Sequence, residues 1–139
     1  MKNKSFLLAV SAILTLCAGT ASIAFGQVPP PPTLLETLDR GMWQLRGIGG
    51  APTSAAISQL CLGDPNRLVQ IQHGDAPCER LVLKSSPTSV TISYSCRGQG
   101  QGITTIRKEG PRLIQIQSQG IQNNSPFSFQ VEGRRTSGC

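Results

Sequence analysis

Four cysteines, spread singly between residue 61 and the last residue, constrain the fold of this chain more than any other feature. They are Cys61, Cys78, Cys96 and Cys139, and a fifth, Cys17, lies in an apolar N-terminal stretch. The four are too far apart in sequence for a Cys-x-x-Cys redox motif or for the closely spaced ligand pairs of a zinc site. An even number of separated cysteines in a small exported domain predicts two disulfide bonds.

Residues 1–26 have the pattern of an export signal. Lys2 and Lys4 give a basic start, Phe6–Leu16 is an uncharged apolar run, and small residues follow it. This pattern predicts a signal peptide that is cleaved after Gly26, and the run is too short to span a membrane comfortably. We therefore expect a periplasmic or secreted protein, with no stable membrane insertion after cleavage.

A second kind of export signal has to be weighed, because Leu14–Cys17 resembles a lipoprotein box. In such a box the cysteine becomes the lipidated first residue, and a small residue comes before it. Leu16 is large, so we expect Cys17 to be removed with the signal peptide rather than to carry a lipid.

The strand pattern between Cys78 and Cys96 favours one of the three possible disulfide connectivities. Leu81–Leu83 and Val90–Tyr94 have the composition of strands, and they flank the turn-rich stretch Ser85–Thr88. This arrangement predicts a hairpin, which would bring the two cysteines at its open end together.

The register of this hairpin can be predicted from its turn. If Lys84 is paired with Ser89, the two hairpin cysteines arrive within one residue of each other, and a small irregularity at Pro77 would complete the approach. The remaining pair is then Cys61 with Cys139, a bridge that would also hold the last residue of the chain in place.

Alternation of apolar and polar residues predicts that residues 41–139 form a mostly all-β domain. Six or seven short strands with turns between them fit an antiparallel meander, in the form of a curled sheet or a small barrel. Ala55–Leu62 is expected to pair with the strand that contains Trp43, across a turn at Gly49–Pro52. Positions expected to share a buried face include Trp43, Leu45, Val90, Ile92, Tyr94, Cys96, Phe127, Phe129 and Val131.

Two segments depart from this β pattern. Residues 27–40 contain Pro29–Pro32, which predicts a stiff, extended spacer, followed by a possible short helix at Thr33–Leu38. Asp64 followed by a proline is typical of a helix start, so Asn66–Gln72 is expected to form one short helix.

Several of these residues line up with a known family. Gly41–Gln44 is similar to the Gly-Leu-Trp-Glu opening of an exported bacterial family, catalogued as domain of unknown function number 3617. The resemblance covers almost all of the mature chain, through the four cysteines and an ending, Gly133–Cys139, similar to the family's Gly-Arg-Arg-x-Gly-x-Cys close. It departs at Arg40, where the family usually has proline, and in a shorter early loop. The resemblance implies export, a β architecture and paired cysteines, and it implies no activity.

The charge of the chain does not indicate a nucleic-acid partner. The chain has thirteen Lys and Arg residues and seven Asp and Glu residues, and cleavage of the signal peptide would remove Lys2 and Lys4. Apart from Arg134–Arg135 the arginines are scattered singly, without the interleaved aromatic residues of a nucleic-acid surface.

The sequence offers little for catalysis, and we expect no cofactor and no metal ion. His73 is the single histidine, and it could act as a base beside Asp75 or Glu79, although a polar loop at a helix end is the simpler interpretation. Gly98–Gly102 has the glycine spacing of a phosphate-binding loop, but it is expected to join two strands and so to be a turn.

Two functions from different classes remain. The first is a non-catalytic envelope module that binds a small ligand or an envelope protein through one face of its sheet or through its interior. Polar residues expected on the exposed faces are Arg107, Arg112, Gln115, Gln117 and Gln119. The alternative is an inhibitor of an exported hydrolase, with its inhibitory loop at Gly98–Gly102 or around His73; a hydrolase that uses His73 is a distant third.

Overall fold

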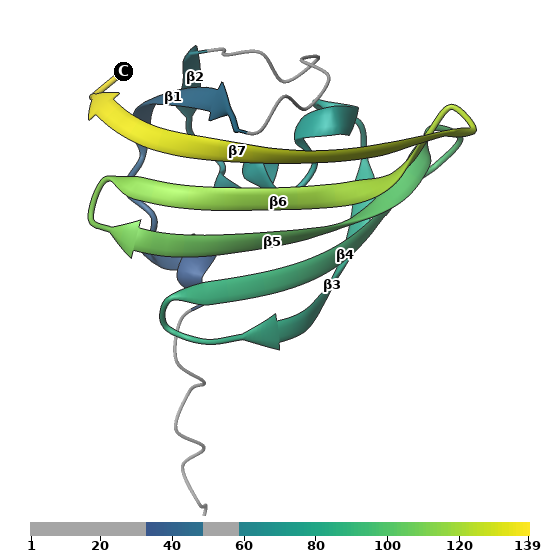
Figure 1. The fold of residues 1–139 in the computed structure, drawn as a ribbon, viewed down its shortest axis with the longest axis horizontal. Helices are drawn as coiled ribbons and strands as arrows, with labels where there is room; N and C mark the ends of the chain where they lie inside the picture. Colours follow the sequence, from purple (N-terminus) through teal and green to yellow (C-terminus); the bar gives the residue numbers. More distant parts are fainter. Residues whose placement is uncertain (1–32, 49–58) are drawn as a thin grey trace, which may run out of the picture.

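Seven strands form one antiparallel sheet in the order β2-β1-β7-β6-β5-β4-β3 (Figure 1). The computed structural model describes residues 33–48 and 59–139, so the expected signal peptide, most of the proline-rich spacer and the Gly49–Pro52 turn lie outside the described residues. The strands are β1 Gly41–Gly47, β2 Gln59–Leu62, β3 Cys78–Ser85, β4 Ser89–Cys96, β5 Gly100–Gly110, β6 Leu113–Gln122 and β7 Ser125–Ser137.

The predicted meander is confirmed over β3 to β7, where each strand pairs with the next in sequence. β7 then pairs with β1, which in turn pairs with β2. The sheet therefore curls without closing, and β2 and β3 are its two edges. Of the two predicted forms, the curled sheet is the one observed.

In the described residues the sheet curls around three short 3-10 turns, which lie behind it in the view of Figure 1. They are η1 Leu34–Thr37, η3 Pro65–Leu68 and η4 Ile71–His73. The prediction of a helix over Asn66–Gln72 is wrong in type, because the segment forms two separate 3-10 turns. Its predicted start is confirmed: the Asp64 side chain accepts a hydrogen bond from the backbone N–H of Asn66 at 2.9 Å.

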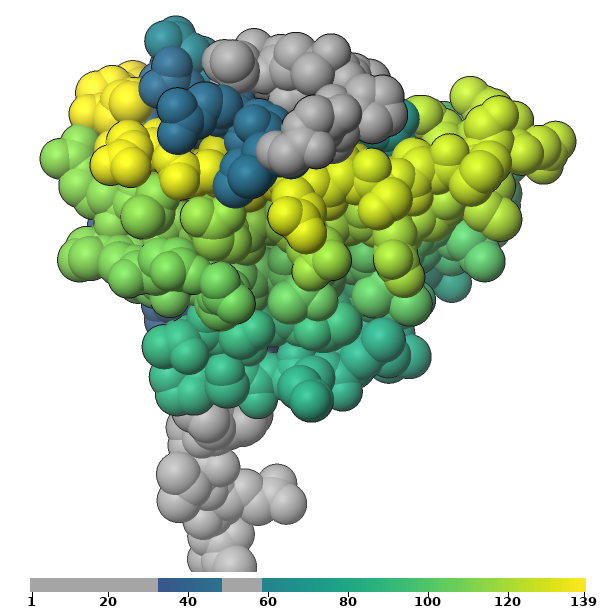
Figure 2. Space-filling view, viewed as in Figure 1, coloured from purple at the N-terminus to yellow at the C-terminus, as the bar shows by residue number. Residues whose placement is uncertain are grey.

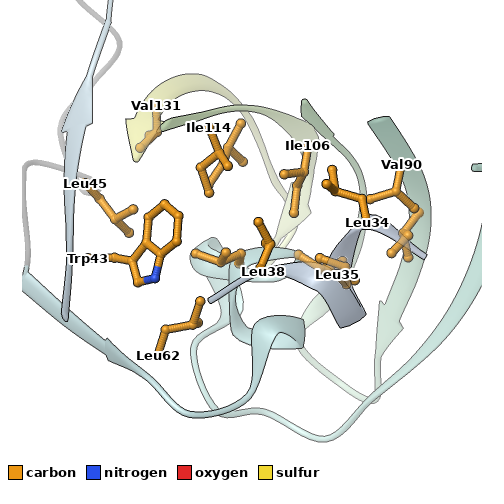
Figure 3. Close-up of a cluster of buried hydrophobic side chains, with 14 of the residues drawn as sticks. Leu34, Leu35, Leu38, Trp43, Leu45, Leu62, Val90, Ile106, Ile114 and Val131 are labelled. Carbon is orange, nitrogen blue, oxygen red and sulfur yellow. The ribbon is translucent and has the colours of Figure 1, made fainter. Parts of the chain in front are cut away.

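The core lies between the inner face of the sheet and these turns (Figure 3). Trp43 is completely buried there, as predicted, and its Nε1–H donates a hydrogen bond to the backbone oxygen of Asp39 at 3.0 Å. Leu34, Leu35 and Leu38 of the first turn pack against the side chains of the strands. The other buried apolar residues are Leu45, Leu62, Leu68, Val69, Val90, Ile92, Tyr94, Cys96, Ile106, Ile114, Ile116, Phe129 and Val131.

Both predicted disulfide bonds are present. Cys78 and Cys96 are directly opposite each other at the open end of the β3–β4 hairpin, with sulfur atoms 2.02 Å apart. Cys61 of β2 is bonded to Cys139, just beyond β7, at 2.12 Å. The second bridge therefore joins two segments that lie on either side of β1.

The predicted register of the β3–β4 hairpin is wrong along its whole length, by one residue up to Val82 and by two at Lys84. Lys84 is paired with Thr91 instead of Ser89, and the register shifts between Val82 and Lys84. The irregularity thus lies at Leu83 in the middle of β3, and not at Pro77. A bulge at this position restores the alignment that lets the two hairpin cysteines meet.

The glycine-rich stretch after β4 is mostly strand rather than turn. The turn covers residues 97–99 only, and Gly102 lies within β5, opposite Gly120 of β6. A Cβ atom at Gly120 would lie 2.1 Å from the backbone oxygen of Gln101, and one at Gly102 would lie 2.6 Å from the Tyr94 hydroxyl. These glycines therefore allow close packing of strands and of the tyrosine ring.

Candidate functional site

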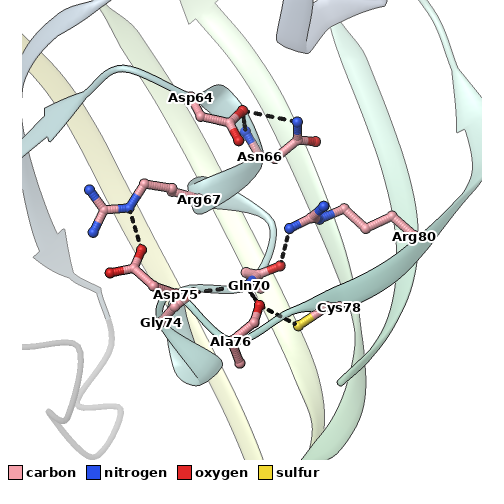
Figure 4. Close-up of polar contacts among 9 residues, drawn as sticks. All are labelled: Asp64, Asn66, Arg67, Gln70, Gly74, Asp75, Ala76, Cys78 and Arg80. Carbon is pink, nitrogen blue, oxygen red and sulfur yellow. Dashed lines mark hydrogen bonds and ion pairs between the residues drawn. The ribbon is translucent and has the colours of Figure 1, made fainter. Parts of the chain in front are cut away.

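The single histidine is buried in the core, which differs from the polar loop that the sequence predicted. His73 is 5 % exposed at the end of η4, and its ring packs edge-on against Tyr94 and Phe127. Its Nδ1 lies 3.2 Å from the Tyr94 hydroxyl, and its Nε2 has no hydrogen-bond partner within the part of the chain that the structure describes. Asp75, one expected partner, forms an ion pair with Arg67 at 3.0 Å instead (Figure 4).

His73 lies at one end of a chain of buried hydrogen bonds. Thr104 donates its one hydroxyl hydrogen to the backbone oxygen of Val69 at 2.6 Å, so in its 2.7 Å bond with Ser118 the serine is the donor. Ser118 also forms a hydrogen bond with Tyr94 that lowers the pKa of the tyrosine hydroxyl. The chain ties η3 and η4 to three strands and gives the buried hydroxyls their partners.

Tyr94 makes the stability of the protein sensitive to alkaline pH. Burial raises the pKa of its hydroxyl above 10.0, and the hydrogen bond to Ser118 opposes the rise without cancelling it. The unfolded chain therefore loses this proton at a lower pH than the folded protein does. As the pH rises above the tyrosine pKa of the unfolded chain, the free energy of unfolding falls.

We therefore expect the folded protein to form phenolate at higher pH than the unfolded protein, and Tyr94→Phe to flatten the alkaline loss of stability. Because the chain has one tyrosine, phenolate absorbance reports this residue alone. Equal phenolate titrations in buffer and in denaturant would contradict the assignment.

Figure 2 shows the outer face of the sheet, which points away from the core. Most of the polar residues that the sequence placed on exposed faces lie on this face. Gln117 lies between Thr105 of β5 and Gln130 of β7 in one cross-strand row. A shallow depression of about 410 Å³ covers this region and is lined by Ser89, Thr105, Arg107, Glu109, Gln115, Ile116, Gln117 and Gln130. It has no buried polar group pointing into it to orient a ligand.

Arg112 does not belong to this outer surface. It lies in the turn between β5 and β6, where its guanidinium donates to the backbone oxygens of Arg135 and Thr136 at 3.1 and 2.7 Å. Its place in the structure therefore favours a role in holding the end of β7, and not the ligand contact that the sequence suggested.

The free edge of β3 is the most unusual surface that the structure describes. Three consecutive large apolar residues are exposed there: Leu81 at 65 %, Val82 at 48 % and Leu83 at 52 %. The side of β3 that does not face β4 has no strand beside it, so its backbone N–H and C=O groups are available for pairing. The opposite edge, β2, has only four residues and is held by the Cys61–Cys139 bridge.

A pocket of about 430 Å³ adjoins this edge on the inner side of the sheet. Its apolar lining includes Val82 and Ile92 of the hairpin and Leu35 and Leu38 of the first turn. The charged residues that line it are Glu36, Arg40 and Arg80. Edge and pocket together form what we call the β3 site, defined as Arg80–Leu83 with this pocket.

Sequence reasoning identified the strand but not the β3 site. One signal was available, because three apolar residues in succession break the alternation expected of a strand with one exposed face. Whether such a run is buried on both faces or lies at a sheet edge depends on topology.

The chain matches no family model, and no curated protein or solved structure is significantly similar to it. The resemblance to the exported family of unknown function therefore stays a prediction. In the described residues no three His, Cys, Asp or Glu side chains are grouped as a metal site would need, and no helix is long and apolar enough to cross a membrane.

Proposed function

We propose that this protein is an exported, non-catalytic module of the cell envelope, periplasmic or secreted, that binds a partner protein. In this proposal the partner supplies an extended segment that adds as a further strand to the free edge of β3. The observation that carries the proposal is the exposure of Leu81, Val82 and Leu83 on a strand with one unpaired side.

Strand addition supplies affinity through main-chain hydrogen bonds and specificity through pockets that take alternate side chains. The β3 site has both parts, since the pocket lies on the side to which Val82 points. Apolar contact with Leu81 on the outer face would add to the burial. Three neighbouring exposed apolar side chains at one edge are typical of a surface that is covered in a complex.

A partner protein is favoured over a small ligand held in the interior. In the described ranges the inner face of the sheet is covered by the core side chains and by the three 3-10 turns. The loops that could have served a hydrolase inhibitor are also constrained: most of Gly98–Gly102 is strand, and His73 is buried.

Export is supported by the basic and apolar pattern of residues 1–26 and by the two disulfide bonds, which form and persist in oxidising compartments. The two observations are independent of each other. Together they favour the periplasm or the cell exterior as the place where a partner is met.

Selection of peptides on the folded protein tests the proposal. We expect a displayed library of random peptides to yield binders, and amide hydrogen exchange to show new protection on β3 when a selected peptide is bound. Leu81→Lys combined with Leu83→Lys should weaken that binding about tenfold or more, because it removes exposed apolar contact area. The matched control is Ile103→Lys, another exposed apolar residue but on β5. Binders that protect the outer face instead of β3 would contradict the proposal.

A further inference from the structure

We infer that the segment received by β3 is acidic and apolar, with an apolar residue opposite Val82 and a carboxylate opposite Arg80. This inference rests on the proposed function and names the chemistry of the partner at the same site. It follows from the two side chains that β3 presents on its inner face next to the pocket.

Arg80 and Val82 point to the same side of the sheet because residues two apart on a strand share a face. On β4 they are paired with Tyr94 and Ile92, which are both buried on the inner side of the sheet. An added strand would place two of its own side chains beside them, again two positions apart. The side chain beside Val82 would contact the apolar lining of the pocket, and the side chain beside Arg80 would contact its guanidinium.

The charges around the β3 site favour an acidic partner. Arg80 is exposed, and its hydrogen bond to the Gln70 side chain fixes its direction (Figure 4). Among the described residues this bond uses one of the five N–H groups of the guanidinium. Arg40 lies on the same pocket. Two arginines and one carboxylate, Glu36, line this pocket, so its charged lining has a net positive charge.

Glu79 is the other carboxylate of β3, and it does not offset these charges at the pocket. It is paired with Ser95 and so points to the outer face, on the opposite side of the sheet from Arg80. The inner face of the edge is therefore basic, and an arginine there can bind a carboxylate through two parallel hydrogen bonds.

A second copy of the chain fits this edge less well than an acidic segment does. In an antiparallel β3–β3 pairing, the inner face of the joined strands would carry Arg80 of both copies and no carboxylate from either β3, because Glu79 lies on the outer face. The bulge at Leu83 also disturbs a regular ladder between two copies.

The test is the residue preference of peptides selected from a random displayed library on three forms of the protein. On the natural protein we expect selected peptides to carry Asp or Glu two positions from an apolar residue. Replacing that carboxylate by lysine in a synthetic copy should weaken binding about fivefold. On Arg80→Glu the preference should change to Lys or Arg.

Two further variants make the result specific. Arg80→Lys keeps the charge and should keep the acidic preference, while thermal unfolding of each variant checks that losing the Gln70 contact has not unfolded it. Arg46→Glu is the matched control, because it makes the same charge change on β1 at the far side of the sheet and should leave the preference unaltered.

The outcomes separate this inference from the proposed function. Peptides that protect β3 from exchange but show no acidic preference would overturn the inference and leave strand addition standing. If no peptide protects β3, both are overturned. A protein that instead dimerises through β3, seen by sedimentation and abolished by Leu81→Lys with Leu83→Lys, would overturn the acidic partner as well.

Discussion

Replacing Cys61 and Cys139 together by serine is expected to lower the free energy of unfolding by about 4.5 kcal/mol, the value that the chain-entropy model gives for a loop of this length. The two residues are 78 apart in sequence, and the bridge joins β2 to the end of the chain. Small domains have about 5–15 kcal/mol of stability in total, so this variant should be close to unfolding at physiological temperature.

The matched control is the double serine variant at Cys78 and Cys96. This bridge closes a separation of only 18 residues and lies within one hairpin. The same model gives about 3 kcal/mol for it, so it should be the less destabilising of the two. Urea unfolding followed by circular dichroism measures both, and a greater loss at the hairpin bridge would contradict the argument.

Replacing Trp43 by alanine is expected to lower the free energy of unfolding by about 3–5 kcal/mol. The side chain is 0 % exposed and lies between β1 and the first turn, so its removal leaves a large cavity. It also leaves the backbone oxygen of Asp39 without its indole donor.

Leu81→Ala is the control for the tryptophan variant. It also removes a large apolar side chain, but from a position that is 65 % exposed, and it should change the free energy of unfolding by about 0.5 kcal/mol or less. Unfolding of both variants is followed by circular dichroism, because tryptophan fluorescence is lost when Trp43, the single tryptophan of the chain, is replaced. A loss at Leu81 comparable to the loss at Trp43 would mean that β3 is buried in the protein in solution.

Much of the fold could be predicted because several strands, β4 above all, alternate between buried and more exposed residues. In β4, Val90, Ile92, Tyr94 and Cys96 are all buried, and this period of two was visible in the sequence. The cysteine pairing followed from the same hairpin. The register of the β3–β4 hairpin was harder to predict, because nothing in a run of three apolar residues indicates that a bulge lies at Leu83.

Features that depend on packing between distant segments could not be predicted. His73 follows a polar stretch and precedes a glycine, which is typical of a surface loop, yet η4 packs it against Tyr94 of β4 and Phe127 of β7. The 3-10 form of Pro65–Leu68 and Ile71–His73 also reflects how the turns fit under the curled sheet.

The β3 site depends on topology in the same way. The sequence predicted a curled sheet or a barrel, and in a closed barrel β3 would have had a neighbour on both sides. Because β7 pairs with β1 and the sheet stays open, Leu81–Leu83 lie at an edge. No pattern within β3 itself distinguishes these two possibilities.

Alternate N-methylation of a bound peptide distinguishes strand addition at β3 from every other way of binding there. Only every second N–H of an added strand points to the edge that it joins. Methylating that set should weaken binding about tenfold or more, while methylating the other set should leave it nearly unchanged. Equal tolerance of both sets would show that the peptide binds through side chains alone, and the account given for β3 would be wrong.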